Sequence, residues 1–210
     1  MTALAVIAKA PAAGRSKTRL TPPCTPAQAA ALAAAALADT LAAMLATPAH
    51  RYVVVLEGTG GPWIDPRFDV IAQRGDGLAE RLAAAFADIG EPALVVGMDT
   101  PQVSPAQLTD AIDRLATADA VLGPAPDGGY WTIGLRQADD AVFEGIPMSV
   151  PATCIAQRAR LDKLGLTTRE LPPLRDVDDI DDANAVAALA PQTRFARAFA
   201  ALGLAGSVAA

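Results

Sequence analysis

Short apolar runs that alternate with helical segments constrain the fold of this 210-residue chain more than any other feature. Several of these runs are apolar at every position, which is typical of strands that are buried on both faces of a parallel sheet. Strands are expected at residues 4–8, 52–57, 68–72, 93–97, 120–123 and 131–135. Because helical segments separate most of them, the pattern predicts an α/β fold with a largely parallel sheet and helices on both faces.

Two helix starts carry the same local signal. Thr25 and Ser104 are each followed by a proline at the first helical position and by a glutamine at the reciprocal position of a capping box. A helix is therefore expected to begin after each of them. Further helices are expected at residues 78–89, 152–164, 182–189 and 193–202.

The composition indicates one folded domain over residues 1–210, because 52% of the residues are hydrophobic and 19% are charged. The net charge of −6 argues against a nucleic-acid partner, since contact with phosphate backbones needs a broad basic surface. Cys24 and Cys154 are too few for a disulfide framework, and no basic segment precedes the first apolar run. These features predict a cytoplasmic protein.

The alanine-rich segment 27–46 is the one candidate for a membrane span. Alanine contributes little transfer energy, and Asp39 and Thr40 lie inside the segment. Leu37, Leu41 and Met44 recur at helical spacing, which predicts a core-facing helix and no membrane span.

The loop after the first strand concentrates basic side chains. No acidic residue precedes Asp39, whereas residues 9–19 contain Lys9, Arg15, Lys17 and Arg19. Gly14 lets the backbone come close to a ligand, and cationic donors beside it suit a polyphosphate. Ligands of α/β folds bind at the carboxyl ends of strands, so a phosphate site is favoured. The alternative is a solvated basic loop.

Two common nucleotide-binding motifs do not match this loop. A P-loop would need glycines where Pro11 and Ser16 stand, and Pro22 and Pro23 prevent a helix from starting directly after Lys17. No Gly-x-Gly-x-x-Gly sequence follows the first strand, which disfavours a dinucleotide-binding Rossmann site.

Asp99 lies two residues after the strand expected at 93–97, in the loop at the carboxyl end of that strand, where ligands of α/β folds bind. A carboxylate there is suited to Mg²⁺ or Mn²⁺, which complete their shells with water and phosphate oxygens. The alternative is a turn-forming aspartate before Pro101.

A second group of carboxylates lies at residues 176–182, which contain five aspartates. In an extended segment Asp176 and Asp178 would lie on one side, which makes them candidate metal ligands. Asp181 or Asp182 is expected to cap the helix that follows.

Two glycine-containing turns are candidates for the edges of a ligand pocket. Asp127, Gly128, Gly129 and Tyr130 lie between two expected strands, and residues 73–78 join a strand to a helix. Both segments are equally compatible with ordinary turn formation and packing.

Together, these motifs resemble the GT-A-like family of domain of unknown function 2064, in order and spacing along nearly the whole chain. The motifs are Ala-Lys-Ala-Pro at 8–11 with Gly14, Lys-Thr-Arg-Leu at 17–20, Gly-Met-Asp-Thr-Pro at 97–101, Asp-Gly-Gly-Tyr at 127–130 and Asp-Val-Asp at 176–178. The family looks similar to the phospholactate and molybdenum-cofactor guanylyltransferases and is often described as glycosyltransferase-like. The resemblance implies a single-domain, three-layer nucleotide-diphospho-sugar transferase fold with a mixed, mostly parallel sheet.

The resemblance also implies a site for a nucleotide, a divalent metal and an acceptor. The residues expected at the phosphates are Lys9, Gly14, Arg15, Lys17 and Arg19. Those expected to border the nucleoside are Gln73 and Gly77, and those expected to face the acceptor are Asp127, Gly128, Gly129 and Tyr130. The expected ligands of Mg²⁺ or Mn²⁺ are Asp99, Asp176 and Asp178. Lys17 and Asp99 are expected to be catalytic.

The expected reaction is nucleotidyl transfer from a nucleoside triphosphate to a small acceptor, with release of pyrophosphate. A covalent intermediate is not expected, because His50 is the single histidine and no Ser-His or Cys-His pair is evident. Two alternatives stay open, namely glycosyl transfer from a nucleotide sugar and a nucleotide-binding module without catalysis. The base, the acceptor and the oligomeric state do not follow from the sequence.

Overall fold

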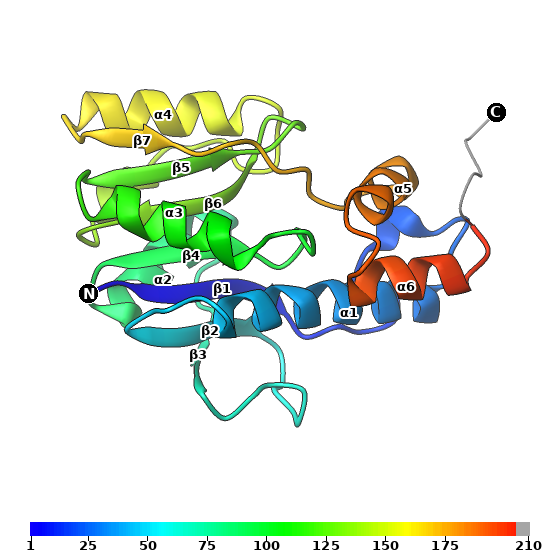
Figure 1. The fold of residues 1–210 in the computed structure, drawn as a ribbon. Helices are drawn as coiled ribbons and strands as arrows, with labels where there is room; N and C mark the ends of the chain where they lie inside the picture. Colours follow the sequence, from blue (N-terminus) through cyan, green and yellow to red (C-terminus); the bar gives the residue numbers. More distant parts are fainter. Residues whose placement is uncertain (205–210) are drawn as a thin grey trace.

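The structure, a computed structural model, describes residues 1–204 and contains one seven-stranded sheet with the strand order β3-β2-β1-β4-β6-β5-β7 (Figure 1). The strands are β1 Ala3–Lys9, β2 Arg51–Glu57, β3 Phe68–Ala72, β4 Ala93–Gly97, β5 Ala120–Pro124, β6 Tyr130–Leu135 and β7 Thr168–Glu170. Strand β6 runs antiparallel to both β4 and β5, and the other neighbouring pairs are parallel. The mixed, mostly parallel sheet is the one expected.

Helices cover both faces of this sheet and extend beyond it. Those in the described residues are α1 Pro26–Leu45, α2 Leu78–Ile89, α3 Pro105–Leu115, α4 Thr153–Lys163, α5 Ile180–Leu189 and α6 Arg194–Ala201, with 3₁₀ turns η1 Thr18–Leu20 and η2 Asp140–Val142. Both expected capping boxes are present, at Thr25 and at Ser104.

The prediction that Asp181 or Asp182 caps α5 is wrong. Asp179 is the N-cap, and its carboxylate accepts hydrogen bonds from the backbone N–H groups of Asp181 and Asp182. The Asp182 carboxylate accepts from the Asp179 N–H in return. Several neighbouring aspartates have nearly equal capping tendency, so the local sequence could not decide which of them begins the helix.

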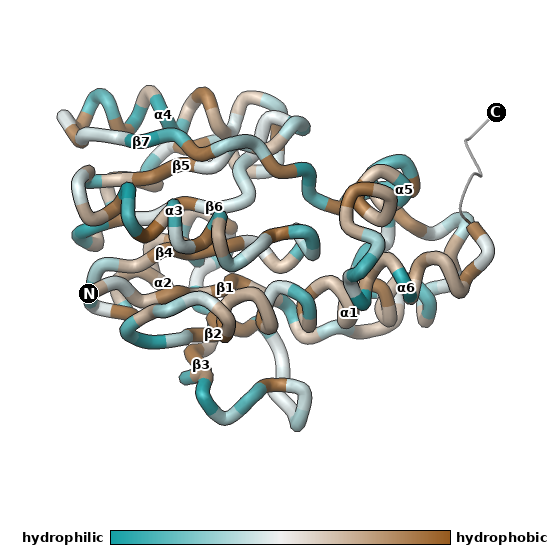
Figure 2. The backbone as a smooth tube through the Cα atoms, in the orientation of Figure 1, coloured by the Kyte–Doolittle hydropathy of each residue, from teal (hydrophilic) through white to brown (hydrophobic). Residues whose placement is uncertain are grey.

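The central strands β1 and β4 are almost entirely apolar because each face of the sheet packs against helices there. Leu4 and Val6 of β1 belong to the core on the side of α1 and α3, whereas Ala3 and Ala5 belong to the core on the side of α2 and α4. This alternation follows from the two-residue period of a strand. Figure 2 shows hydrophobic residues along the central strands. The result is a three-layer arrangement.

A third core lies beyond the sheet, where the first half of α1 packs against α5 and α6 (Figure 1). Phe195 and Phe199 of α6 are fully buried there. The carboxylate of Asp39, in α1, accepts hydrogen bonds from the backbone N–H groups of Arg194 and Phe195. The buried carboxylate of Asp39 thus joins α1 to the start of α6.

By length and composition, α1 is the one helix among the described residues that could cross a membrane. Half of its most apolar window is buried within the fold, and its N-terminal half packs against α6. Core packing therefore accounts for the buried half of this window.

Candidate functional site

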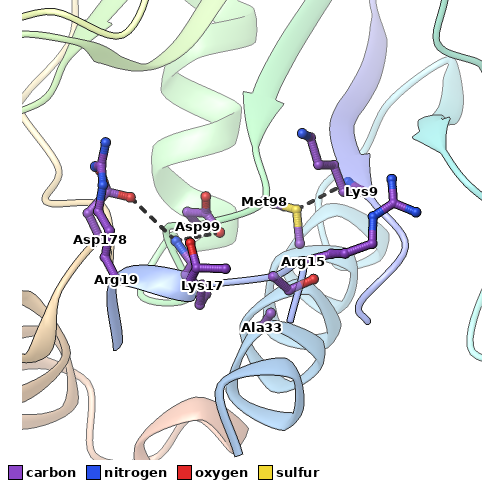
Figure 3. A pocket seen from close by; sticks show the side chains of 10 residues that line it. Lys9, Arg15, Lys17, Arg19, Ala33, Met98, Asp99 and Asp178 are labelled. Atoms are coloured by element: carbon purple, nitrogen blue, oxygen red, sulfur yellow. Dashed lines mark hydrogen bonds and ion pairs between the residues drawn. The ribbon is translucent and has the colours of Figure 1, made fainter. Parts of the chain in front are cut away.

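The loops that follow β1 and β4 line a cavity of about 200 Å³ together with Asp178 (Figure 3). Its basic lining residues are Lys9, Arg15, Lys17 and Arg19, and its acidic ones are Asp99 and Asp178. The basic loop and the first expected metal ligand thus meet at the carboxyl ends of two neighbouring parallel strands, where α/β folds bind ligands.

Lys17 lies between the two carboxylates of the cavity. Its Nζ is 2.9 Å from Asp99 Oδ1 and 3.6 Å from Asp178 Oδ1, and it donates a hydrogen bond to the carbonyl of Val177. Only 8% of the side chain is exposed. The backbone of Lys17 is left-handed, with φ 50°, which is uncommon for a residue other than glycine. Protein groups therefore surround the ammonium that was expected to contact phosphates.

The other three basic side chains of the cavity are mostly exposed. Lys9 Nζ is 3.3 Å and Arg15 Nη2 is 3.7 Å from the Glu57 carboxylate, and Arg19 Nη1 donates to Asp178 Oδ2 at 2.7 Å. Exposed ion pairs contribute little to stability, so these groups can turn toward a bound anion at small cost.

Glu57, at the end of β2, was not singled out by the sequence. Partial burial raises the pKa of its carboxyl, but Lys9 and Arg81 outweigh this and hold the pKa below its ordinary value. Glu57 therefore stays ionised and holds the side chains of Lys9 and Arg15 at the entrance of the cavity.

Three carboxylates gather beside the cavity. Oxygens of Asp127, Asp176 and Asp178 lie within 4.8 Å of one another, whereas Asp99 is not part of this group and faces Lys17. Burial, reinforced by the charges of Asp127 and Asp178, raises the pKa of Asp176 to about 6. Close carboxylates disfavour their own ionisation unless a cation offsets them, and oxygen donors of this kind suit Mg²⁺ or Mn²⁺.

The loop after β4, residues 98–104, contains buried polar atoms that have no hydrogen-bond partner within the described residues. Asp99 Oδ1, Thr100 Oγ1 and Gln102 Oε1 are buried and accept or donate no hydrogen bond within the described residues. Asp99 Oδ1 has the Lys17 ammonium nearby, but not in hydrogen-bonding geometry. Such atoms are rare in folded proteins and fit a site that is completed by a ligand. The donor set therefore fits a divalent cation with its water or phosphate oxygens.

Residues 175–179, here called the acidic strap, cross from the sheet to α5. The N–H of Val177 donates to the carbonyl of Asp99 at 2.9 Å, and Gln102 Nε2 donates to the carbonyl of Arg175. The side chain of Val177 is fully buried in the third core. Because the Val177 side chain points into this core, its neighbours Asp176 and Asp178 point to the other side, where they lie near Asp127.

The turn that carries Asp127 is held tightly against the start of α4. Asp127 Oδ1 accepts a hydrogen bond from the N–H of Gly129 at 2.8 Å, and the N–H of Cys154 donates to the carbonyl of Gly128 at 2.8 Å. Gly128 has φ 90°, and a Cβ there would lie 2.0 Å from the carbonyl oxygen of Pro151. Only glycine fits this position, and it fixes where Asp127 stands.

Replacement of Gly128 by alanine is expected to move Asp127 away from the strap. The free energy of unfolding should fall by about 2–4 kcal/mol, because the cost of the clash with the Pro151 backbone adds to the cost of a left-handed conformation at alanine. Stabilisation by Mn²⁺, measured by thermal unfolding, should be lost. Gly145→Ala is the matched control, since Gly145 has φ 72° but no atom within 4 Å of a Cβ. An equal response of the two variants to Mn²⁺ would contradict this role.

The remaining residues expected at the site have contacts within the protein. Gln73 Nε2 donates to the carbonyls of Ala8 and Val55, and so joins the ends of β1 and β2. The hydroxyl of Tyr130 is 3.4 Å from Gln157 Oε1, and burial raises its pKa far above the usual value. Gly77 is the N-cap of α2 and has no side chain to cap it. Contact of these residues with a nucleotide or acceptor stays a prediction.

The family model described as an uncharacterized protein conserved in bacteria (DUF2064) matches residues 29–150. The chain belongs to this family. The expected membership is therefore confirmed, and the match includes the Asp99 loop and the Asp127 turn. Among curated protein sequences, none matches the chain.

Solved structures share the fold over most of the chain. A candidate nucleotide-diphospho-sugar transferase from Desulfovibrio desulfuricans G20 is 27% identical, with a TM-score of 0.84 over 96% of this chain and 93% of that one. CMP:2-keto-3-deoxy-manno-octonic acid synthetase in complex with CTP is 13% identical, with a TM-score of 0.58 over 91% and 98%. Rv0371c from Mycobacterium tuberculosis H37Rv in complex with manganese is 22% identical, with a TM-score of 0.50 over 88% and 96%. The DUF2064 chain thus has the fold of nucleotide-dependent transferases.

Proposed function

We propose that this protein transfers a nucleotidyl group from a nucleoside triphosphate to a small acceptor, with a divalent metal and with release of pyrophosphate. The observation that carries the proposal is the position of the basic cavity directly beside the Asp127, Asp176 and Asp178 carboxylates. Transfer from a triphosphate needs cationic groups for the phosphates and a metal site next to them.

The metal would be held by Asp176 and Asp178 of the strap and by Asp127. When bound, Mg²⁺ or Mn²⁺ would offset negative charge on the phosphate oxygens. Asp99, which was expected to be a metal ligand, pairs with Lys17 and lies outside the group of three carboxylates. It would coordinate the ion only if the Lys17 side chain moved away from it. A structure of Rv0371c, a protein of the same fold, contains manganese, which supports a divalent metal as the partner of this fold.

The basic loop would bind and orient the phosphates. Lys9, Arg15 and Arg19 are mostly exposed around the cavity, whereas Lys17 is buried against the strap. The acceptor oxygen would form a bond to the α-phosphorus while the bond to the pyrophosphate oxygen breaks. Positioning and charge stabilisation then account for most of the rate enhancement.

The candidate nucleophiles of the chain support direct transfer. Cys24 and Cys154 are buried, and burial raises the pKa of both thiols. His50 lies just before β2 and is 3.6 Å from Glu91, at the amino-terminal end of the strands, whereas the cavity lies at their carboxyl ends. None of the three is positioned to form a covalent intermediate at the cavity.

Glycosyl transfer from a nucleotide sugar is the second candidate function. It is favoured by the similarity to the candidate nucleotide-diphospho-sugar transferase, which covers nearly all of both chains. The same cavity would then hold a diphosphate, and the acceptor would attack the anomeric carbon.

A thermal-unfolding panel distinguishes the two functions, because a ligand of the native state raises the melting temperature by mass action. Nucleoside triphosphates and nucleotide sugars are each tested with and without Mn²⁺. We expect one triphosphate to give a Mn²⁺-dependent shift larger than that of its nucleoside diphosphate sugar. A shift confined to a nucleotide sugar would support glycosyl transfer, and no shift with any nucleotide would contradict both functions.

A further inference from the structure

The ammonium of Lys17 is an internal cation of the carboxylate-rich site. It contacts Asp99 Oδ1, Asp178 Oδ1 and the Val177 carbonyl, and its side chain is 8% exposed. The other two lysines of the chain, Lys9 and Lys163, are exposed. An ammonium has three donors and no acceptor; one of them donates to the Val177 carbonyl, and the other oxygens nearby are those of Asp99 and Asp178.

Asp178 is shared between this internal cation and the carboxylate group that would hold a metal. One of its oxygens faces Lys17 and the other is 2.7 Å from Arg19, while the same residue belongs to the group with Asp127 and Asp176. A divalent ion bound at Asp178 would lie a few ångströms from the ammonium. Like charges at such a distance repel strongly in a partly buried site. The ammonium and the ion therefore compete for Asp178.

Lys17 can leave its position without disturbing the core. It lies on the loop between β1 and η1, outside the helices and strands, and its left-handed backbone is disfavoured for lysine. The contacts of its side chain stabilise this conformation. The cavity that holds Arg15 and Ser16 adjoins the same side chain, so a released ammonium has a polar space to enter (Figure 3).

We propose that Lys17 is a resident counter-ion that the divalent metal displaces from Asp178, after which the ammonium enters the basic cavity and meets the nucleotide phosphates. The inference rests on the proposed function, because it takes the metal and the phosphates from there. Metal and triphosphate would then bind cooperatively, since each favours the displaced position of Lys17. In the absence of metal, the ammonium offsets part of the negative charge of Asp99 and Asp178.

Lysine labelling of the wild-type protein tests the displacement without a variant. The chain has only three lysines, so reductive methylation followed by peptide mass spectrometry reports each of them separately. Without metal, Lys17 should react roughly tenfold more slowly than Lys9 and Lys163, because it is buried and paired. Saturating Mg²⁺ alone should speed the reaction of Lys17 several-fold and leave the other two unchanged. Addition of the triphosphate should protect Lys17 again.

An unchanged rate at Lys17, under conditions where Mg²⁺ raises the melting temperature, would overturn the displacement. If Mg²⁺ neither binds nor changes the reactivity of Lys17, the inference and the metal-dependent function both fall. If Mg²⁺ exposes Lys17 but no nucleotide binds, the displacement of Lys17 by the metal stands, whereas its contact with phosphates and the proposed function both fall.

Calorimetric titration with Mn²⁺ alone gives a second test. Lys17→Met should bind Mn²⁺ roughly tenfold or more tightly than the wild type, because a neighbouring positive charge is removed. Arg19→Met is the matched comparison, since Arg19 contacts the same carboxylate but is 71% exposed, and its effect should be much smaller. Equal or weaker Mn²⁺ binding by Lys17→Met would overturn the inference and assign Lys17 to holding the carboxylates in place.

Discussion

Replacement of Asp176 by asparagine is expected to stabilise the metal-free protein while weakening metal binding. The folded protein raises the pKa of Asp176 from 3.8 to about 6, so it holds the proton more strongly than the unfolded chain does. The free energy of unfolding therefore falls as the pH rises from about 4 through about 6 and stays lowered above that range. The asparagine variant does not suffer this loss.

The gain at pH 7.5 should be about 1–2 kcal/mol, which is less than the full pKa shift would give because the side chain is partly exposed. Affinity for Mn²⁺ should fall roughly a hundredfold, since a charged ligand of the ion is lost. Urea unfolding without metal and calorimetric titration with Mn²⁺ measure the two effects. Asp181→Asn is the control, because Asp181 is exposed in the first turn of α5 and both values should stay near those of the wild type. A destabilised Asp176→Asn protein with normal Mn²⁺ affinity would contradict the metal site.

Replacement of Lys17 by methionine is expected to lower nucleotidyl transfer roughly a hundredfold or more. A charge pair at about 4 Å contributes roughly 4 kcal/mol at an effective dielectric near 20, and the Lys17 ammonium would act on the phosphates at such a distance. Loss of the ammonium also leaves Asp99 without its cation, so the metal-free variant should be less stable by about 1–3 kcal/mol. Mn²⁺ should restore most of this stability.

Pyrophosphate release, measured with the nucleotide and acceptor that the wild type uses, gives the rate of transfer. Lys163→Met is the control, because Lys163 is an exposed residue at the end of α4 and its loss should leave the rate unchanged. Wild-type rates in Lys17→Met would show that the basic loop does not act on the transferred group.

Much of the fold could be predicted because its determinants are local. The continuous apolar runs of the central strands follow from burial on both faces, and the capping boxes at Thr25 and Ser104 need only four neighbouring residues. Strand β7, Thr168–Glu170, was missed because it is a short edge strand with only polar and charged residues. The antiparallel insertion of β6 between β4 and β5 has no local signal, since pairing depends on residues far apart in the chain.

The sequence indicated most of the residues that line the candidate cavity, but it indicated neither Glu57 nor the contacts among these residues. Asp127 lies about 50 residues before the strap and was expected at the acceptor, and only the folded chain brings it to Asp176 and Asp178. The pairing of Lys17 with Asp99 joins two loops that follow neighbouring strands, and the order of those strands was not predictable from the sequence. Sequence motifs therefore indicate which side chains carry the chemistry, whereas the order of the strands decides which of these side chains come into contact.

The most direct test of the account is a crystal structure of the protein with Mn²⁺ and the triphosphate selected by the unfolding panel, with the ion located by its anomalous scattering. We expect the ion to contact the carboxylates of Asp176 and Asp178, with the phosphates between it and Arg15. An ion bound elsewhere, or a triphosphate bound away from residues 9–19, would contradict the proposed site and the reaction built on it.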